Sequence, residues 1–354
     1  MIVKKSGYIL VLSLMMVSLC VVLVTALVDR GTVFLPFTAT YQHRQQAYML
    51  ALSGVQIAKS QLAVVPKQEE AKADQAKQAA TVPDEKARAT ALLQKLFPVL
   101  NRWQTFDLTQ EKDGIDGHIK LCIMCEDGKI DINALYDFEK QQFAGQGQEA
   151  EKVKKVLQEL FSSIEKQTQG KNLFQSVEAF LKKRGYPLDD PTQLLLVKGF
   201  EGFKNNVFYE PLVSKNEKEK KQLYLTDIFT VWTGKKTVEP WFFSSSVQQI
   251  LGLRVSPDSK KAAAALKSFT VQAQWPVTWN STFAQLYETE FAALPKNIDS
   301  LLSKKFEPKI FSVLVHGLFD QITQRVFAIV ERVEQKSDKG QISYSVSIRK
   351  LYWF

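Results

Sequence analysis

Cysteine is scarce in this sequence. The three cysteines among 354 residues are too few for a disulfide framework. Cys20 lies in an apolar run, where we expect it to pack as a small hydrophobic side chain. Cys122 and Cys125 form the pattern Cys-Ile-Met-Cys. In an extended strand, however, residues three apart point to opposite faces and lie about 10 Å apart, too far for a disulfide. We therefore expect two buried thiols, and a disulfide only if the strand bends between them.

Histidine and catalytic motifs are scarce as well. His43, His118 and His316 are far apart in the sequence, and none has a nucleophile or a metal ligand at motif spacing. The sequence lacks Gly-x-Ser-x-Gly, a phosphate-binding glycine loop and His-Glu-x-x-His. No second cysteine pair or neighbouring histidine completes a zinc site. These absences argue against an enzyme and predict neither catalytic residues nor a metal centre of these kinds.

Charge of one sign is not concentrated in any segment. The 46 Lys and Arg residues against 37 Asp and Glu residues give a net charge of +9, which could suggest a nucleic acid partner. The two signs are interspersed, however, as in the stretch 217–221, which reads Glu-Lys-Glu-Lys-Lys. No basic helix face or aromatic platform accompanies them. We therefore expect a solvated surface and no nucleic acid partner.

Only one apolar run is long. Residues 8–28 carry no charged side chain, follow Lys4-Lys5-Ser6-Gly7 and precede Asp29-Arg30. A helix from Tyr8 to Val28 would be about 31 Å long, which matches the hydrocarbon core of a bilayer. The lysines on its short side predict that the amino terminus is cytoplasmic and that the bulk of the chain lies across the membrane.

Three kinds of segment fit this run. The first is a plain signal anchor. The second is a cleaved secretory signal, because Val24-Thr25-Ala26 would suit a peptidase that leaves Leu27 as the new terminus. The third depends on Gly7, which follows two lysines and directly precedes the apolar run.

This third pattern resembles the leader of type IV pilins and type II secretion pseudopilins. The resemblance implies that a prepilin peptidase cuts between Gly7 and Tyr8 and methylates the new terminus. Most pilins carry a glutamate where this sequence has Leu12, and the K-type pseudopilins typically lack it. A carboxylate in hydrocarbon needs a partner, and a subunit at the tip of a filament has no subunit ahead of it to provide one. Leu12 therefore fits a K-type subunit.

Beyond the membrane segment, Gly31 and Pro36 predict a kink or break in the helix. Helical periodicity resumes over 41–62, with one apolar stripe of mostly small residues: Ala47, Leu50, Ala51, Gly54, Val55, Ala58 and Leu62. The stripe either seats the helix on its own domain or contacts another subunit. The resemblance implies both, with a subunit interface at Ala47, Leu50, Ala51, Gly54 and Ala58.

A strand at 118–125, an Asp-Gly turn at 126–129 and a returning strand at 130–133 predict a β-hairpin. This stretch resembles the hairpin of K-type pseudopilins at Asp127, Gly128, Lys129 and Asn133, with Asp131 in place of the family's usual asparagine. The helix that the family has before the hairpin is expected at Trp103. A strand over 225–231 resembles another family motif, with Phe229 as its matching residue, but the turn that follows lacks the family's asparagines.

Further elements follow from periodicity and punctuation. We expect helices at 149–166, 173–183, 192–200 and 247–253, the last capped by the serines at 244–246. We expect three antiparallel C-terminal strands at 310–319, 324–333 and 341–352, with a turn at 336–340.

The chain thus predicts an α+β fold, in which a long pilin-like N-terminal helix packs on an antiparallel β-sheet head with an inserted, mainly α-helical domain. The expected parts are a leader (1–7), a transmembrane helix (8–28), an extended helix (29–62), a spacer (63–89), the first part of the head (90–140), the inserted domain (141–222), its helix-rich continuation with a strand at 225–232 (223–309) and the C-terminal sheet (310–354).

The function that the resemblance implies is that of a minor pseudopilin. Such a subunit starts and caps the periplasmic pseudopilus of a type II secretion system, with I-like and J-like pseudopilins, the prepilin peptidase and the inner membrane as partners. No cofactor is expected, although Asp189 and Asp190 could contribute oxygens to a calcium ion or cap a helix instead. The alternative function is a signal-anchored or secreted periplasmic binding protein or enzyme with an unrecognised site.

Overall fold

The computed structural model describes residues 6–63, 95–144, 147–209, 222–254, 275–303, 308–336 and 342–354. The lysines of the leader lie outside these ranges. So do the expected spacer, except for Ala63, and the expected turn at 336–340, except for Lys336.

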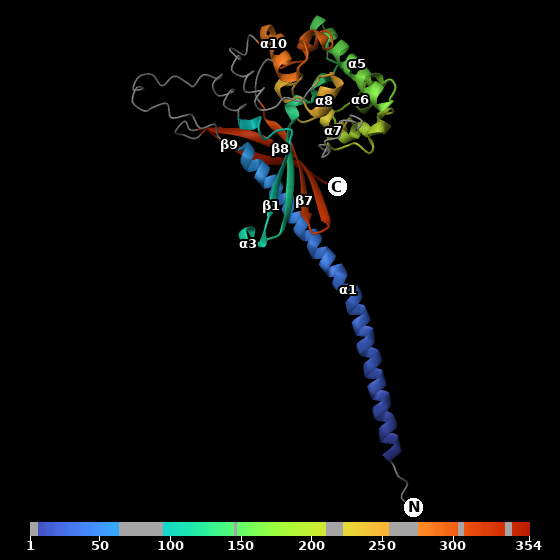
Figure 1. Ribbon diagram of the computed structural model, residues 1–354. Coiled ribbons are helices and arrows are strands. Elements are labelled where there is room, and N and C mark those ends of the chain that lie inside the picture. Colours follow the sequence, from blue (N-terminus) through green and yellow to red (C-terminus); the bar gives the residue numbers. More distant parts are fainter. Residues whose placement is uncertain are drawn as a thin grey trace, which may run out of the picture.

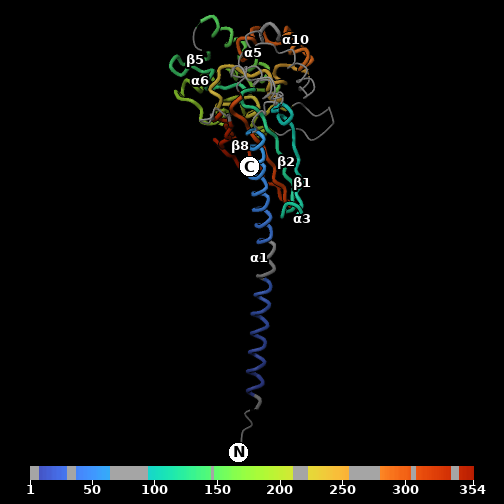
Figure 2. Tube along the Cα trace, turned by 90° about the vertical axis from the view of Figure 1, so that its left-hand side faces the viewer, coloured from blue at the N-terminus to red at the C-terminus, as the bar shows by residue number. Residues whose placement is uncertain are grey.

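One helix dominates the shape of the molecule. Helix α1 runs from Ser6 to Leu62 without interruption, and its 57 residues span about 85 Å. It forms a shaft that projects from the head, with the N-terminus at its free end (Figures 1 and 2). The expected break at Gly31 and Pro36 is therefore wrong. A proline removes one main-chain hydrogen bond from a helix, and the many bonds on either side are enough to keep this long helix continuous.

The head is built on a five-stranded antiparallel sheet with the strand order β1-β2-β7-β8-β9. Its strands are β1 (Trp103–Leu108), β2 (Gly117–Cys125), β7 (Ile310–Phe319), β8 (Ile322–Lys336) and β9 (Ile342–Trp353). The three expected C-terminal strands are confirmed, as is the strand that ends at Cys125. Trp103 begins strand β1, so the helix expected before the hairpin does not reach it; Lys95 and Leu96 are helical, and the part of the expected run at 91–94 lies outside the described residues. The short helix α3 (Gln110–Asp113) joins β1 to β2.

The C-terminal part of α1 lies across one face of this sheet. The apolar stripe is buried there, and a Cβ atom added to Gly317 of β7 would lie 2.3 Å from the Ala47 carbonyl oxygen and 2.4 Å from the Ala51 nitrogen. On the helix side, a Cβ atom at Gly54 would lie 2.3 Å from Cγ1 of Val315. The two glycines therefore permit a close approach of helix and strand that larger residues would prevent.

The helical lobe is inserted between two neighbouring strands of the sheet. Strand β2 pairs with β7, although Cys125 and Ile310 are 185 positions apart in the sequence. The described residues between them form the lobe at the end of the sheet remote from the N-terminus (Figure 1). Its elements are η1 (Glu126–Gly128), β3 (Ile130–Asp131), α4 (Ile132–Leu135), β4 (Tyr136–Asp137), β5 (Gln142–Phe143), α5 (Gln148–Thr168), α6 (Leu173–Arg184), η2 (Pro191–Leu196), η3 (Phe200–Phe203), α7 (Leu225–Ile228), β6 (Phe229–Thr230), η4 (Pro240–Phe242), α8 (Ser245–Ile250), α10 (Trp275–Tyr287), η6 (Phe291–Ala293) and η7 (Ile298–Ser300).

The expected helices agree with the structure where the amphipathic pattern is long. Helices α5 and α6 lie where they are expected. Helix α8 is capped by the Ser244 hydroxyl, which accepts a hydrogen bond from the Val247 N–H at 3.2 Å. The expected helix at 192–200 is instead two short 3₁₀ turns, η2 and η3. The expected strand at 225–231 is wrong except at Phe229 and Thr230, because helix α7 occupies its first half.

The expected hairpin is also wrong in its second half. The segment after the turn pairs in parallel with β6, with Ile130 opposite Phe229, and then enters helix α4. Both sides of β2 are already occupied by β1 and β7, so no position remains for a returning strand. Neither Asp127 nor Gly128 has the positive φ that a two-residue hairpin turn requires. The α+β class and the long helix on an antiparallel sheet are nevertheless as predicted.

Candidate functional site: an exposed apolar helix and the joint behind it

The N-terminal half of α1 projects away from the head. Among the described residues, one helix contains a segment long and apolar enough to cross a membrane, Tyr8–Asp29. Its described side chains are exposed throughout, and they include Tyr8, Leu12 and Val28 of the expected membrane helix. The bond between Gly7 and Tyr8 lies in the first turn of α1, which begins at Ser6. This segment therefore fits a single-pass membrane anchor.

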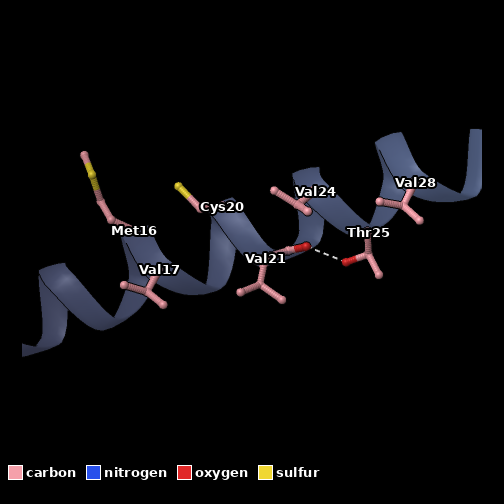
Figure 3. Close-up of a pocket in the computed structure, with 7 residues that line it drawn as sticks. All are labelled: Met16, Val17, Cys20, Val21, Val24, Thr25 and Val28. Carbon is pink, nitrogen blue, oxygen red and sulfur yellow. Dashed lines mark hydrogen bonds between the residues drawn. The ribbon is translucent and has the colours of Figure 1, made fainter. Parts of the chain in front are cut away.

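The polar side chains of this segment are satisfied within the helix. The Ser13 and Ser18 hydroxyls donate to the carbonyl oxygens of Leu10 and Met15, each at 2.9 Å. The Thr25 hydroxyl donates in the same way to the carbonyl of Val21 (Figure 3). Intrahelical bonds of this kind satisfy the Ser13, Ser18 and Thr25 hydroxyls without a partner outside the helix.

A shallow apolar hollow runs along one face of the same helix. Figure 3 shows the side chains that line it: Met16, Val17, Cys20, Val21, Val24, Thr25 and Val28. All belong to a single helix, so the hollow is a surface between successive turns rather than an enclosed pocket. Cys20 is exposed on this face instead of packing within the chain. Lipid chains or a second helix could contact it.

The small-residue stripe is covered by the chain's own sheet. Ala47, Ala51 and Ala58 are fully buried, Leu50 is 3% exposed, and Gly54 is buried beneath Val315. These side chains seat the helix on its own domain, which is one of the two roles that the sequence suggests. They have no free surface for a neighbouring subunit, so the expectation of a subunit contact through them needs correction.

The opposite face of α1 is exposed and uncharged. Its residues follow the helical spacing at the level of the head: Gln42, Gln45, Met49, Ser53, Gln56 and Ser60. The Ser53 and Ser60 hydroxyls donate to the carbonyls of Met49 and Ile57, each at 2.9 Å. We call these six residues the outer face of α1.

The family-like residues gather where the sheet meets the lobe, which we call the joint. Gly128 of η1 packs against the backbone of η4 so closely that a Cβ atom would lie 1.8 Å from the Phe242 carbonyl oxygen. Asp127 is buried, forms an ion pair with Lys235 (2.7 Å) and accepts a hydrogen bond from the Lys309 N–H at 3.1 Å. Its own carbonyl accepts the Glu239 N–H at 2.7 Å. The Asp-Gly turn thus connects three segments that are distant in sequence.

Asn133 and Phe229 hold the next layer of the joint. The Asn133 amide donates to the Leu188 carbonyl and accepts the Leu188 N–H, each at 2.8 Å. Phe229 is fully buried and stacks on Phe161, with ring centroids 5.5 Å apart. Asn133 therefore fixes the loop after α6 to α4, and Phe229 fixes β6 to α5.

Asp131 is a buried carboxylate surrounded by donors. It caps α4 through the Ala134 N–H (3.0 Å) and also accepts the Thr233 N–H (2.9 Å), the Thr233 hydroxyl (2.8 Å) and the Gly234 N–H (2.9 Å). Burial raises the pKa of Asp131, and these hydrogen bonds offset only part of that effect. An asparagine in its place could provide the same acceptor oxygen without the charge.

Lys129 is a buried cation whose charge is balanced locally. It is 1% exposed and forms an ion pair with Glu126, which is also buried. Its ammonium group donates a further hydrogen bond to the Ser312 hydroxyl of β7 at 3.1 Å. The pair therefore joins the turn to the sheet, and removing one partner alone would leave a buried charge.

The cysteines and histidines have separate surroundings. Cys122 and Cys125 are both buried free thiols, in apolar clusters on opposite faces of β2, as the strand geometry predicts. Burial raises the pKa of both thiols. His43 lies 3.4 Å from Asp320, His118 lies 2.7 Å from Asp107, and His316 packs on Trp103. The structure does not bring the three imidazoles together.

Asp189 and Asp190 are occupied by protein contacts, and Asp190 has the helix-capping role that is one of the two expected alternatives. Asp190 caps η2 through the Thr192 N–H at 2.8 Å, pairs with Lys350 at 2.9 Å and accepts a hydrogen bond from the Tyr352 hydroxyl. Asp189 pairs with Arg184 at 3.0 Å. A calcium ion would have to displace both cations. No group of three or more potential metal ligands occurs within the described ranges.

Two buried charged residues escaped the sequence analysis. Asp227 of α7 and Arg332 of β8 are 0% and 5% exposed, respectively. The signal for Asp227 is a lone carboxylate among apolar residues in the run from Leu225 to Val231. Arg332 carries no such signal, since charged residues are common along a strand that has one solvated face.

Comparison with known proteins gives a likeness among solved structures. No family model matches the chain. No curated protein matches it either. Among solved structures, it is similar to a chain of the GspK-GspI-GspJ complex from the enterotoxigenic Escherichia coli Type 2 Secretion System, with 14% sequence identity and a TM-score of 0.46. The alignment covers 90% of this chain and 99% of that chain. A likeness at this identity says nothing about individual residues.

Proposed function

We propose that this chain is a minor pseudopilin of the K type, which starts and caps the pseudopilus of a type II secretion system and has no catalytic role. The observation that carries the proposal is the continuity of α1. A single unbroken helix contains the apolar anchor and also seats the sheet, so the head is fixed rigidly to the membrane segment. A filament subunit needs this coupling, because its head must move together with the helix when that helix packs against other subunits.

The leader and Leu12 support the same role. Two lysines and Gly7 precede the apolar run, which is the pattern that a prepilin peptidase cuts. Leu12 places no carboxylate in the apolar segment, so the helix does not require a partner ahead of it. In this proposal the N-terminus is cytoplasmic before cleavage, the helix lies in the inner membrane, and the head is periplasmic.

The shape of the head supports a position at the tip. The inserted lobe lies at the end of the molecule opposite to the N-terminus of α1 (Figure 2). A subunit added beyond this one would meet the lobe before it could reach α1. The lobe would therefore stop growth in that direction while leaving the membrane-proximal part of α1 free.

The outer face of α1 is the surface that we assign to the neighbouring subunits. It is exposed and uncharged and belongs to the same helix as the anchor, whereas the small-residue stripe is covered by the sheet. Its partners would be pseudopilins of the I and J types. Their helices would pack on Met49, Ser53 and Gln56, where the serine hydroxyl is already bonded within its own helix.

The test of the proposal is the mature N-terminus in the native host. Mass spectrometry should find N-methylated Tyr8. A terminus at Leu27 would indicate a secreted protein, and an intact Met1 would indicate a plain anchor; either result would overturn the proposal.

For the interface, Ser53→Cys on the outer face should crosslink to a companion subunit. Asp107→Cys, at an exposed position of β1, is the matched control that should not.

A further inference from the structure

Among the buried ionisable groups of the joint, three interact with one another and their charges do not cancel. Glu126, Lys129 and Asp227 are 2%, 1% and 0% exposed, which gives two carboxylates for one ammonium. Lys129 is committed to Glu126 and to the Ser312 hydroxyl. Asp227 is therefore left without an ion-pair partner among these three groups.

Asp227 has few contacts that would stabilise a negative charge. One carboxyl oxygen accepts the Ser246 N–H at 2.7 Å, while the other is buried without a hydrogen-bond partner. Its main-chain carbonyl accepts the Ser244 hydroxyl, so the residue connects α7 to the start of α8. Burial of this carboxyl group outweighs its contacts with Ser246 and Lys129, so the neutral acid is favoured over a wider pH range than in a solvated aspartate.

The groups that face Asp227 come from each neighbouring element. Lys129 and Glu126 act on it from the turn after β2, Cys122 from β2 itself, and Tyr209 from the loop before α7. Burial is the largest influence on the Asp227 pKa and raises it, Lys129 lowers it, and Glu126 raises it again. The raised pKas of Cys122 and Tyr209 keep both groups neutral in the same range.

We propose that Asp227 is a proton-operated latch between the sheet and the helical lobe. With its proton, Asp227 is a neutral acid and the joint is closed. When it loses the proton, the set of Glu126, Lys129 and Asp227 holds two carboxylates and one ammonium, and α7 and α8 loosen from the turn at 126–129. This latch is independent of the role proposed above, because it depends only on contacts inside the head.

The sign of the pH effect follows from the raised pKa. Between the usual value of 3.8 and the higher value in the folded chain, the folded chain binds more protons than the unfolded chain. The stability of the closed joint therefore falls as pH rises through that window. The fall is on the order of tenfold in the closing equilibrium per pH unit at most.

The test is hydrogen exchange of the full chain in detergent micelles over a pH series, read on peptides from 225–250. Asp227→Asn keeps an acceptor for the Ser246 N–H and cannot ionise. The ratio of wild-type to Asp227→Asn exchange at each pH removes the intrinsic pH dependence of exchange. We expect this ratio to rise with pH, whereas the exposed control Asp107→Asn should track the wild-type chain at every pH.

A second variant keeps the test valid if Asp227→Asn does not fold. Glu126→Gln retains an acceptor for Lys129 but leaves the ammonium facing one carboxylate. The pH dependence of exchange in 225–250, measured against the same control, should then shrink. Two results would overturn the latch. One is a ratio of wild-type to Asp227→Asn exchange that does not change with pH, and the other is a steeper pH dependence of exchange in Glu126→Gln than in the wild-type chain.

Discussion

The guanidinium of Arg332 donates a hydrogen bond from Nε to the main-chain carbonyl of Leu62 at 2.8 Å. Leu62 is the last residue of α1, where helix carbonyls have no partner within the helix and the helix dipole is negative. The same guanidinium lies 3.4 Å from the ring centroid of Tyr344 on β9. Arg332 therefore ties the end of the anchor helix to two strands of the sheet.

Replacing Arg332 should release this end of the helix. We expect Arg332→Met to destabilise the head by about 1–3 kcal/mol, because the Leu62 carbonyl loses a charged donor and the Tyr344 ring loses its cation. Chemical denaturation of the full chain in detergent measures the change. Arg349→Met removes a more exposed arginine paired with Glu331 and should change stability by less than about 1 kcal/mol. Equal losses of stability in Arg332→Met and Arg349→Met would show that the contact with the Leu62 carbonyl is unimportant.

The close approach of helix and sheet predicts a difference between two glycines. A methyl group at Gly317 would meet the backbone of α1, which cannot move without displacing the helix. A methyl group at Gly54 would meet the side chains of Val315 and Ile119, which can shift. We expect both alanine variants to be destabilised, by about 1–3 kcal/mol for Gly54→Ala and by more for Gly317→Ala. Thermal unfolding of the two variants checks the order, and the reverse order would contradict this packing.

Acid should weaken the contact between the lobe and β9. Burial tends to raise the pKa of Asp190, but hydrogen bonds from Thr192, Tyr352 and Lys350 outweigh it and hold that pKa below the usual 3.8. The stabilisation is therefore present above pH 3.8 and is lost as pH falls through the lower value in the folded chain. Asp190→Asn should reduce stability at pH 7 and reduce the loss between pH 4 and pH 2. Denaturation curves at these pH values measure both effects. If Asp190→Asn lost as much stability between pH 4 and pH 2 as the wild-type chain, Asp190 would not be the group responsible.

Leu12 offers a test of assembly that is separate from folding. We expect Leu12→Glu to insert in the membrane, because a charge in a transmembrane helix costs only about 2.5–3.5 kcal/mol on insertion scales and the rest of the segment is apolar. At the tip of a filament, however, its carboxylate would have no partner and assembly should suffer. Membrane fractionation and secretion of an exported protein measure the two steps, with Leu12→Met as the control. Normal secretion by Leu12→Glu would mean that our explanation of Leu12 is wrong.

The parts of the fold that the sequence predicts well are those with a long, regular pattern. The strands at 310–319 and 324–333 alternate clearly, and α5 has one continuous apolar stripe, so each element follows from local periodicity. The failures occur where distant contacts decide. The segment after Gly128 has the sequence of a hairpin, but β1 and β7 occupy both edges of β2 and divert it to β6.

The candidate site likewise has features that local sequence predicts and contacts that it does not. The anchor follows from composition alone, and the stripe on α1 is a regular pattern whose partner, the chain's own sheet, is not encoded locally. The joint brings Asp127 to Lys235 and Asn133 to Leu188, and β8 brings Arg332 to Leu62 at the end of α1; sequence separation hides each of these pairs. Pro36 shows the opposite error, since a strong local signal for a break is outweighed by the helix around it.

The insertion of the lobe between adjacent strands also has a consequence for synthesis. Strand β2 cannot pair with β7 until the chain has grown by the 185 positions that separate Cys125 from Ile310. At about 5–20 residues per second, this delay lasts roughly 10 to 40 s. Throughout that time β2 exposes an unpaired apolar edge to any other nascent strand nearby. A chaperone that covered this edge would protect the emerging chain until β7 is made.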